Sequence, residues 1–286
     1  MKTLISVEQL AAELARRHDI RVIDVRWTLG GPPGLGEYLT GHIPGAAYAD
    51  LDTELASHGQ PADGRHPLPS RKTLQDATRR WGLNPGDTVV VYDGAGNLSA
   101  ARAWWLLTDA GVADVLLLDG ALPAWRAAGL PLAEGPEQIA PGTITLSKGV
   151  MPVLDADGAA ALASTGLLLD ARAGARYRGE TEPIDPRAGH IPGARSAPTT
   201  ENLDADGRFL SPEELRKRFE ALGAGAGAGS AVESEHIGVY CGSGVTAAHE
   251  AVALVLAGYE PVLYPGSWSQ WSNLPDRPVE TGEAPA

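Results

Sequence analysis

The chain has 286 residues, which is long for one typical domain and sufficient for two that each bury a core. Its 36 acidic and 23 basic side chains give a formal charge of −13 without any basic tract longer than Arg-Lys-Arg, which argues against nucleic acid or anionic membrane as partners. The single cysteine excludes an intramolecular disulfide, and with no signal-peptide or membrane-span pattern we expect a cytoplasmic protein.

The first half of the chain alternates helix-like and strand-like segments. Ser6 and Gln9 form a capping-box pattern that predicts a helix from residue 7. A Gly/Pro-rich loop is expected up to Thr40, and the polar segment 50–69 is long for a loop in a compact domain, which usually indicates function. The other expected elements are strands at 20–25, 88–92 and 115–118 and helices at 70–81 and 98–110.

The second half repeats this order. The sequence Gly-His-Ile-Pro-Gly-Ala occurs at 41–46 and again at 189–194. The spacings agree, because 170 − 24 and 271 − 125 both give 146, while 190 − 42 and 240 − 92 both give 148. A duplicated domain is therefore predicted, with boundaries at 1–138 and 153–286 and a linker at 139–152.

The elements expected in the second half complete the pattern. They are strands at 167–169, 237–240 and 262–264 and helices at 211–222 and 247–257, the latter ended by Gly258. Strands that alternate with helices predict an α/β fold with mainly parallel sheets, helices on both faces and sites at the carboxyl ends of the strands. The Gly/Ala repeat at 223–230 is expected to be a loop without chemistry, and the tail 280–286 to fray.

One tight turn contains the strongest candidate for a catalytic residue, the single cysteine of the chain. Cys241-Gly-Ser-Gly-Val-Thr246 lies between the strand at 237–240 and the following helix. Gly242 and Gly244 allow the backbone amides to turn inward, and the helix N-terminus points at the same place, so we expect the thiol to be held as a thiolate. A buried structural cysteine is the alternative, and the glycine-flanked turn disfavours it.

This turn resembles the active loop of the rhodanese superfamily, in the form found in 3-mercaptopyruvate sulfurtransferases. The resemblance covers nearly the whole chain and implies two tandem rhodanese-like domains. In the first copy the residue aligned with Cys241 is Asp93, which cannot carry sulfur, so that copy is expected to be catalytically inactive.

Further site residues come from the loops. His66, in the long irregular segment, is the best histidine for proton transfer, and the resemblance implies an Asp50–His66–Ser243 relay. It also implies that Arg176 binds a substrate carboxylate, for which a planar guanidinium is suited. Arg187 is the candidate for a second clamp or else a surface residue. The remaining predicted substrate-binding residues are Gly242, Gly244, Val245 and Thr246.

The predicted reaction is sulfur transfer. Cys241 is expected to take sulfur from 3-mercaptopyruvate as a persulfide and pass it to cyanide or to an external thiol, either thioredoxin-like or of low molecular weight, since the chain has no second cysteine. No metal and no organic cofactor are expected. The neutral Gly-Ser-Gly of the loop favours mercaptopyruvate over thiosulfate, which remains the alternative donor. A phosphatase, which would need an arginine where Ala247 stands, and a non-catalytic sulfur carrier are weaker alternatives.

Overall fold

The computed structural model describes residues 2–225 and 236–283. The chain divides into two compact units. Unit 1 comprises the described residues of Met1–Ser57, Leu68–Met151 and Ala205–Phe209, and unit 2 those of His58–Pro67, Pro152–Asp204 and Leu210–Ala286. The sequence predicts two continuous domains, whereas the units exchange the short segments 58–67 and 205–209. The first of these segments contains His66.

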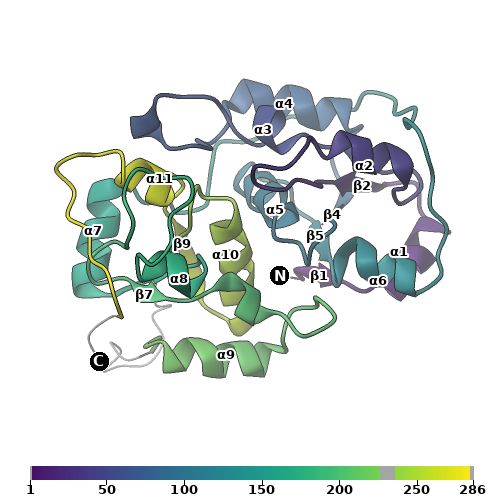
Figure 1. Ribbon diagram of the computed structural model, residues 1–286. Coiled ribbons are helices and arrows are strands. Elements are labelled where there is room, and N and C mark those ends of the chain that lie inside the picture. The colour runs from purple at the N-terminus through teal and green to yellow at the C-terminus, as the bar shows by residue number, and fades with distance from the viewer. Residues whose placement is uncertain (1, 226–235, 284–286) are drawn as a thin grey trace. The chain divides into compact units, whose positions relative to one another are not determined.

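Unit 1 is built on a five-stranded parallel sheet in the order β1-β5-β4-β2-β3 (Figure 1). The strands are β1 (Leu4–Ile5), β2 (Ile20–Asp24), β3 (Ala47–Tyr48), β4 (Thr88–Tyr92) and β5 (Val115–Leu118). Its helices are α1 (Val7–Leu14), α2 (Leu35–Thr40), α3 (Leu51–Glu54), α4 (Arg71–Arg80), α5 (Ala100–Asp109) and α6 (Ala121–Ala127). The predicted capping box of Ser6 and Gln9 begins α1. Side chains of α1 and α6 form one hydrophobic core with one set of strand residues.

Unit 2 repeats the design with a four-stranded parallel sheet in the order β7-β6-β8-β9. The strands are β6 (Leu167–Asp170), β7 (Arg195–Ser196), β8 (His236–Tyr240) and β9 (Glu260–Leu263). Its α-helices are α7 (Ala156–Thr165), α8 (Gly174–Tyr177), α9 (Pro212–Ala221), α10 (Thr246–Ala257) and α11 (Ser267–Trp271), with short 3₁₀ helices η1 (Pro61–Asp63) and η2 (Thr199–Asn202). Helices α7 and α11 share a core with β6 and β8. The predicted α/β class with parallel sheets is confirmed.

The repeated Gly-His-Ile-Pro-Gly-Ala motif has a structural role in both units. The His42 ring stacks on Tyr38 with centroids 3.9 Å apart, and its Nδ1 lies 2.9 Å from the carbonyl oxygen of that tyrosine. His190 repeats both contacts with Tyr177, at 3.7 Å and 2.9 Å. Because the same arrangement holds both turns, neither histidine is needed to explain a reaction confined to one copy.

Several short elements differ from the sequence expectations. The loop expected up to Thr40 contains α2, and the irregular segment 50–69 contains α3 and η1. The tail expected to fray from Glu280 instead pairs with His190, through one backbone hydrogen bond in each direction of 2.8 and 3.1 Å. Residues 226–230 of the Gly/Ala repeat and residues 284–286 of the tail lie outside the described residues. No helix of the described part of the chain is both long and apolar enough to span a membrane.

Candidate active site around Cys241

Cys241 directly follows β8 and is buried, with 2% of its surface exposed. Its backbone is held on both sides: its N–H donates to Ser267 Oγ at 3.1 Å, and its carbonyl accepts the Trp268 N–H at 2.9 Å. The Gly244 N–H points at the sulfur, with N and Sγ 3.1 Å apart. A backbone donor aimed at sulfur favours negative charge there, as the sequence predicts for the loop.

The two glycines of the loop serve different purposes. Gly244 has a φ of +77°, and a Cβ there would lie 2.4 Å from the Pro265 carbonyl oxygen, so only glycine fits. Gly242 does not have a positive φ, which corrects the expectation that both glycines supply unusual backbone conformations. A Cβ at Gly242 would lie 3.3 Å from both Arg65 Nη2 and Arg176 Nη1. The absence of a side chain at 242 therefore leaves space in front of two guanidinium groups.

Helix α10 begins five residues after the cysteine. Val245 stands at its N-cap, buried and without a side-chain cap hydrogen bond, and Thr246 is its first residue, half-buried. The N–H of Ala248 donates to the Val245 carbonyl at 3.1 Å, and other amides at a helix start that no side chain caps are available to water or to an anion. At its other end, Gly258 takes the left-handed conformation with φ +86°, as its predicted role as the helix stop requires.

His66 lies against Ser243, the second residue after the cysteine. The distance between His66 Nδ1 and Ser243 Oγ is 2.7 Å, and both residues are buried. This hydroxyl–imidazole contact joins segment 58–67 to the cysteine loop within unit 2. Asp50 belongs to unit 1, where it caps α3 by accepting the Thr53 N–H at 3.0 Å. Its part in the relay stays a prediction.

Arg176, on α8, has one edge of its guanidinium occupied. Its Nε and Nη2 donate to the two carboxylate oxygens of Glu182 at 3.2 and 2.6 Å, and Nη2 also lies 3.2 Å from Asp185 Oδ2. Nη1 lies 3.3 Å and Nη2 3.8 Å from the Cβ position of Gly242, and of these two only Nη1 makes no contact with Glu182 or Asp185. The predicted clamp thus stands next to the loop with the edge best suited to a carboxylate already used.

Arg187 is held by the backbone. Its guanidinium donates four hydrogen bonds of 2.7–2.8 Å to carbonyl oxygens in and just after α11. The acceptors are Trp271, Ser272, Leu274 and Arg277. A guanidinium has five N–H donors, so this geometry favours a brace for the chain after α11. The predicted contact of Arg187 with substrate stays a prediction, with at most one donor left to make it.

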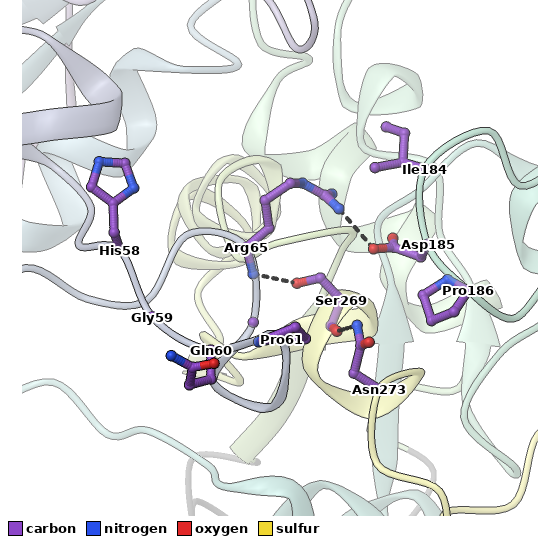
Figure 2. A pocket seen from close by; sticks show the side chains of 11 residues that line it. His58, Gly59, Gln60, Pro61, Arg65, Ile184, Asp185, Pro186, Ser269 and Asn273 are labelled. Atoms are coloured by element: carbon purple, nitrogen blue, oxygen red, sulfur yellow. Dashed lines mark hydrogen bonds and ion pairs between the residues drawn. The ribbon is translucent and has the colours of Figure 1, made fainter.

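Arg65 is a site residue that the sequence reasoning missed. Its Nη1 pairs with Asp185 Oδ1 at 2.7 Å (Figure 2), and its Nη2 lies 3.3 Å from the Cβ position of Gly242. Burial raises the pKa of the Asp185 carboxyl above its ordinary value, and the positive charge of Arg65 opposes that rise. The one signal in the sequence is the position of Arg65 next to His66, the residue predicted to transfer a proton.

In the corresponding turn of unit 1, a carboxylate of the chain itself accepts the backbone N–H groups. Asp93 takes the place of the cysteine, and its carboxylate accepts four backbone N–H groups at 2.7–3.1 Å. The donors are Ala95, Asn97, Ser99 and Ala100. Burial raises the pKa of Asp93 while these amides oppose the rise. The turn of the first copy is thus filled by a carboxylate of the chain itself.

The fold and site define a duplicated α/β protein with parallel sheets. The turn of unit 2 carries a thiol, and the corresponding turn of unit 1 does not. Residues 6–128 and 155–274 each match the Rhodanese-like domain family, and the chain belongs to that family. The tandem organisation and the membership predicted from the sequence are confirmed.

Relatives along nearly the whole length carry sulfurtransferase names. A Pseudomonas aeruginosa protein provisionally named as a 3-mercaptopyruvate sulfurtransferase is 48% identical over 98% of both chains. A Mycobacterium tuberculosis protein, SseB, provisionally named as a thiosulfate sulfurtransferase, is 43% identical over 99% of this chain and 98% of its own. The crystal structure of SseA from Escherichia coli, described as a 3-mercaptopyruvate sulfotransferase, superposes with a TM-score of 0.81 at 32% identity, covering 94% of this chain and 99% of its own.

Proposed function

We propose that the protein is a sulfurtransferase that moves sulfur from 3-mercaptopyruvate to a thiol or cyanide through a persulfide on Cys241. The observation that carries the proposal is the surroundings of this one thiol. A backbone N–H points at its sulfur, the Ser243 hydroxyl of the same loop contacts the His66 imidazole, and two guanidinium groups face Gly242. The relatives named as 3-mercaptopyruvate sulfurtransferases support the choice of donor.

The first step forms the persulfide. The Cys241 thiolate attacks the donor sulfur, a sulfur–sulfur bond forms, and the carbon–sulfur bond breaks with its electron pair going to carbon. Pyruvate leaves as its enolate and takes a proton, which the Ser243 hydroxyl delivers and His66 replaces across the 2.7 Å contact. The Gly244 N–H, 3.1 Å from Sγ, stabilises negative charge on the cysteine. Asp50 is proposed as the third member of this relay, as the family resemblance implies.

The second step returns the enzyme to its thiolate form. An acceptor thiolate or cyanide attacks the outer sulfur of the persulfide, the new bond forms as the sulfur–sulfur bond breaks, and Cys241 leaves as thiolate. The acceptor comes from outside because the chain has a single cysteine. A single cysteine that forms no intramolecular disulfide suits a reducing compartment, so we place the protein in the cytoplasm, where thiol acceptors are kept reduced. The corresponding turn of unit 1, with Asp93 in place of the cysteine, carries no sulfur in either step.

Thiosulfate is the second candidate donor, and one observation favours it. The cysteine loop itself is neutral, but the structure brings Arg65 and Arg176 to within 3.3 Å of the Cβ position of Gly242. Their positive charge weakens the argument that a neutral loop disfavours thiosulfate, which is a small dianion. The relative named as a thiosulfate sulfurtransferase belongs to the same set of close matches.

One experiment tests the reaction and the donor together. The purified full chain is given 3-mercaptopyruvate or thiosulfate with cyanide, and pyruvate and thiocyanate are measured as products. We expect a higher kcat/KM with mercaptopyruvate, and mass spectrometry after donor treatment should find one added sulfur on Cys241. The Cys241→Ser variant is the control and should show neither turnover nor added sulfur. A preference for thiosulfate would overturn the donor, and turnover by the serine variant would overturn the nucleophile.

A further inference from the structure

Arg65 is fixed relative to the cysteine loop by backbone contacts. Its main-chain N–H donates to Ser269 Oγ at 3.0 Å (Figure 2), and the N–H of the same serine donates to the Gly242 carbonyl at 2.8 Å. The preceding residue, Gly64, has a φ of +87°, and a Cβ there would lie 2.8 Å from the Gly266 carbonyl oxygen. One serine of α11 therefore holds both the segment that bears Arg65 and the loop that bears the thiol.

The guanidinium of Arg65 is only partly satisfied. Nη1 is paired with Asp185, but Nε and Nη2 are buried and have no hydrogen-bond partner among the residues that the structure describes. Buried donors without acceptors cost free energy, so such groups usually serve a ligand or an ordered water. Nε and Nη2 form one edge of the guanidinium, and two parallel N–H groups on one edge match the two oxygens of a carboxylate.

Arg176 differs from Arg65 at this edge. The Nε–Nη2 edge of Arg176 is occupied by Glu182, so this arginine offers Nη1 alone to the space in front of Gly242. Asp185 holds the two guanidinium groups together, with Oδ1 on Arg65 and Oδ2 on Arg176 at 2.7 and 3.2 Å. The pair is thus pre-positioned, and the unoccupied edge belongs to Arg65.

We infer that Arg65 is the main carboxylate-binding residue of the site and sets its preference for 2-oxo acid donors, with Arg176 supplying a second donor. This inference rests on the proposed function and adds a contact that is absent from the sequence reasoning. A donor with its sulfur at Cys241 has its carboxylate three bonds away from that sulfur, toward Gly242 and the two guanidinium groups. Pyruvate, which keeps this carboxylate after sulfur is lost, binds the same edge and competes with the donor.

Arg65 also lines a pocket of about 430 Å³ together with Asp185 and Ser269 (Figure 2). The carboxylate of Asp185 faces Nη1 on this side, while the unoccupied Nε–Nη2 edge is buried. A lysine at 65 could keep the ion pair with Asp185 but could not present two parallel N–H groups. The lysine variant therefore lacks the two parallel N–H groups of the guanidinium but keeps its positive charge.

The test compares three variants of the full chain: Arg65→Ala, Arg65→Lys and the control Arg216→Ala. Arg216 is an exposed residue of α9 in the same unit, where it lies over the Tyr259 ring. Steady-state kinetics are measured with mercaptopyruvate and with thiosulfate, and the inhibition constant of pyruvate is measured against each donor. Thermal unfolding shows whether each variant is folded.

We expect Arg65→Ala to lower kcat/KM for mercaptopyruvate about 30- to 1000-fold, largely through KM, because a desolvated charge pair is lost. Pyruvate inhibition should weaken in parallel, thiosulfate turnover should fall much less, and Arg65→Lys should recover only part of the loss. Arg216→Ala should behave as the wild type.

Three results would overturn the inference: unchanged mercaptopyruvate kinetics in Arg65→Ala, full recovery in Arg65→Lys, or equal losses with both donors. If Arg65→Ala does not fold, the lysine variant decides, because it retains the positive charge opposite Asp185. If the wild type does not use mercaptopyruvate at all, the proposed donor fails, and calorimetric titration with pyruvate then tests the Arg65 contact separately. Equal pyruvate affinity in the wild type and Arg65→Lys would in that case overturn the inference.

Discussion

At the scale of single residues, the thiol and the proposed proton donor are separate groups in the same loop. Cys241 and Ser243 are two positions apart, and the imidazole that supports the serine comes from His66, 177 residues earlier in the chain. The two candidate donors make different demands on this pair. Mercaptopyruvate leaves a carbon-centred enolate that must be protonated, whereas thiosulfate leaves sulfite, which needs no proton. The serine should therefore matter for one donor more than for the other.

Ser243→Ala should lower kcat with mercaptopyruvate by about 10²- to 10⁴-fold, the range for a lost general acid, and should affect thiosulfate turnover far less. Steady-state kinetics with both donors measure this difference. Ser272→Ala is a suitable control, because Ser272 is buried in the same unit and its Oγ has no hydrogen-bond partner among the described residues. Equal loss with both donors would mean that Ser243 supports the loop and not the proton transfer.

The sequence predicts the candidate site residues that a local pattern marks and does not predict Arg65, whose place depends on tertiary contacts. Cys241 and Ser243 stand in a short motif, and His66 stands in an unusually long irregular segment. Arg65 reaches Gly242 only because segment 58–67 packs on α11, and no spacing in the sequence indicates that packing. Arg187 is predicted as a clamp because of its residue type, and no sequence pattern indicates its backbone partners in and after α11.

At the scale of elements, α10, the helix that follows the cysteine loop, carries a buried polar network. Glu250 is fully buried, accepts a 2.6 Å hydrogen bond from Asn202 Nδ2 and lies 3.6 Å from Arg218 Nη1. One position earlier, His249 Nδ1 lies 2.7 Å from Thr199 Oγ1. Burial raises the pKa of Glu250 from 4.5 to about 7, although the nearby charge of Arg218 opposes the rise.

This pKa predicts how stability depends on pH. Since the folded-state pKa lies above the unfolded value, the contribution of Glu250 is fully present below about pH 4.5 and is lost as pH rises through about 7. The difference between the two pKa values corresponds to a loss of at most about 3 kcal/mol in the free energy of unfolding. Glu250→Gln removes the titrating group, so its free energy of unfolding should fall less than that of the wild type between pH 5 and pH 8. Urea unfolding at both pH values measures this, with exposed Glu220→Gln as control. Parallel losses in wild type and Glu250→Gln would contradict the assignment.

The elements that the sequence predicted well are the long ones. The strands β2, β4 and β8 and the helices α4, α5 and α10 carry five or more residues of clear periodicity or apolar composition. Helix α7 is the exception, since its ten residues were not predicted as a helix. The missed strands β1, β3 and β7 have two residues each, too few for any period, and exist because they pair with a longer neighbour. Helix α2 was hidden for a similar reason, since Gly- and Pro-rich sequence precedes it.

At the scale of the whole molecule, the duplication can be followed residue by residue. Tyr38 and Tyr177 each donate a 2.7 Å hydrogen bond from the hydroxyl to the carbonyl of the alanine that ends the repeated motif. Aligned through these tyrosines, Glu37 of unit 1 takes the place of Arg176, because each stands one residue earlier. In the turn, Asp93-Gly-Ala-Gly corresponds to Cys241-Gly-Ser-Gly, so unit 1 has lost the thiol, the hydroxyl and the positive charge together.

This comparison predicts that a thiol alone will not restore the first copy. In a Cys241→Ser background, Asp93→Cys should release no more pyruvate from mercaptopyruvate than Cys241→Ser does. Ala95 stands in place of the serine, and Glu37 would repel the donor carboxylate that Arg176 is proposed to bind. The control is Asp93→Cys with Cys241 intact. It should unfold more easily, because four backbone N–H groups lose their acceptor at a cost of about 2 kcal/mol or more, yet it should keep turnover when folded. Turnover in the double variant above the Cys241→Ser background would show that the cysteine position alone separates the active copy from the inactive one.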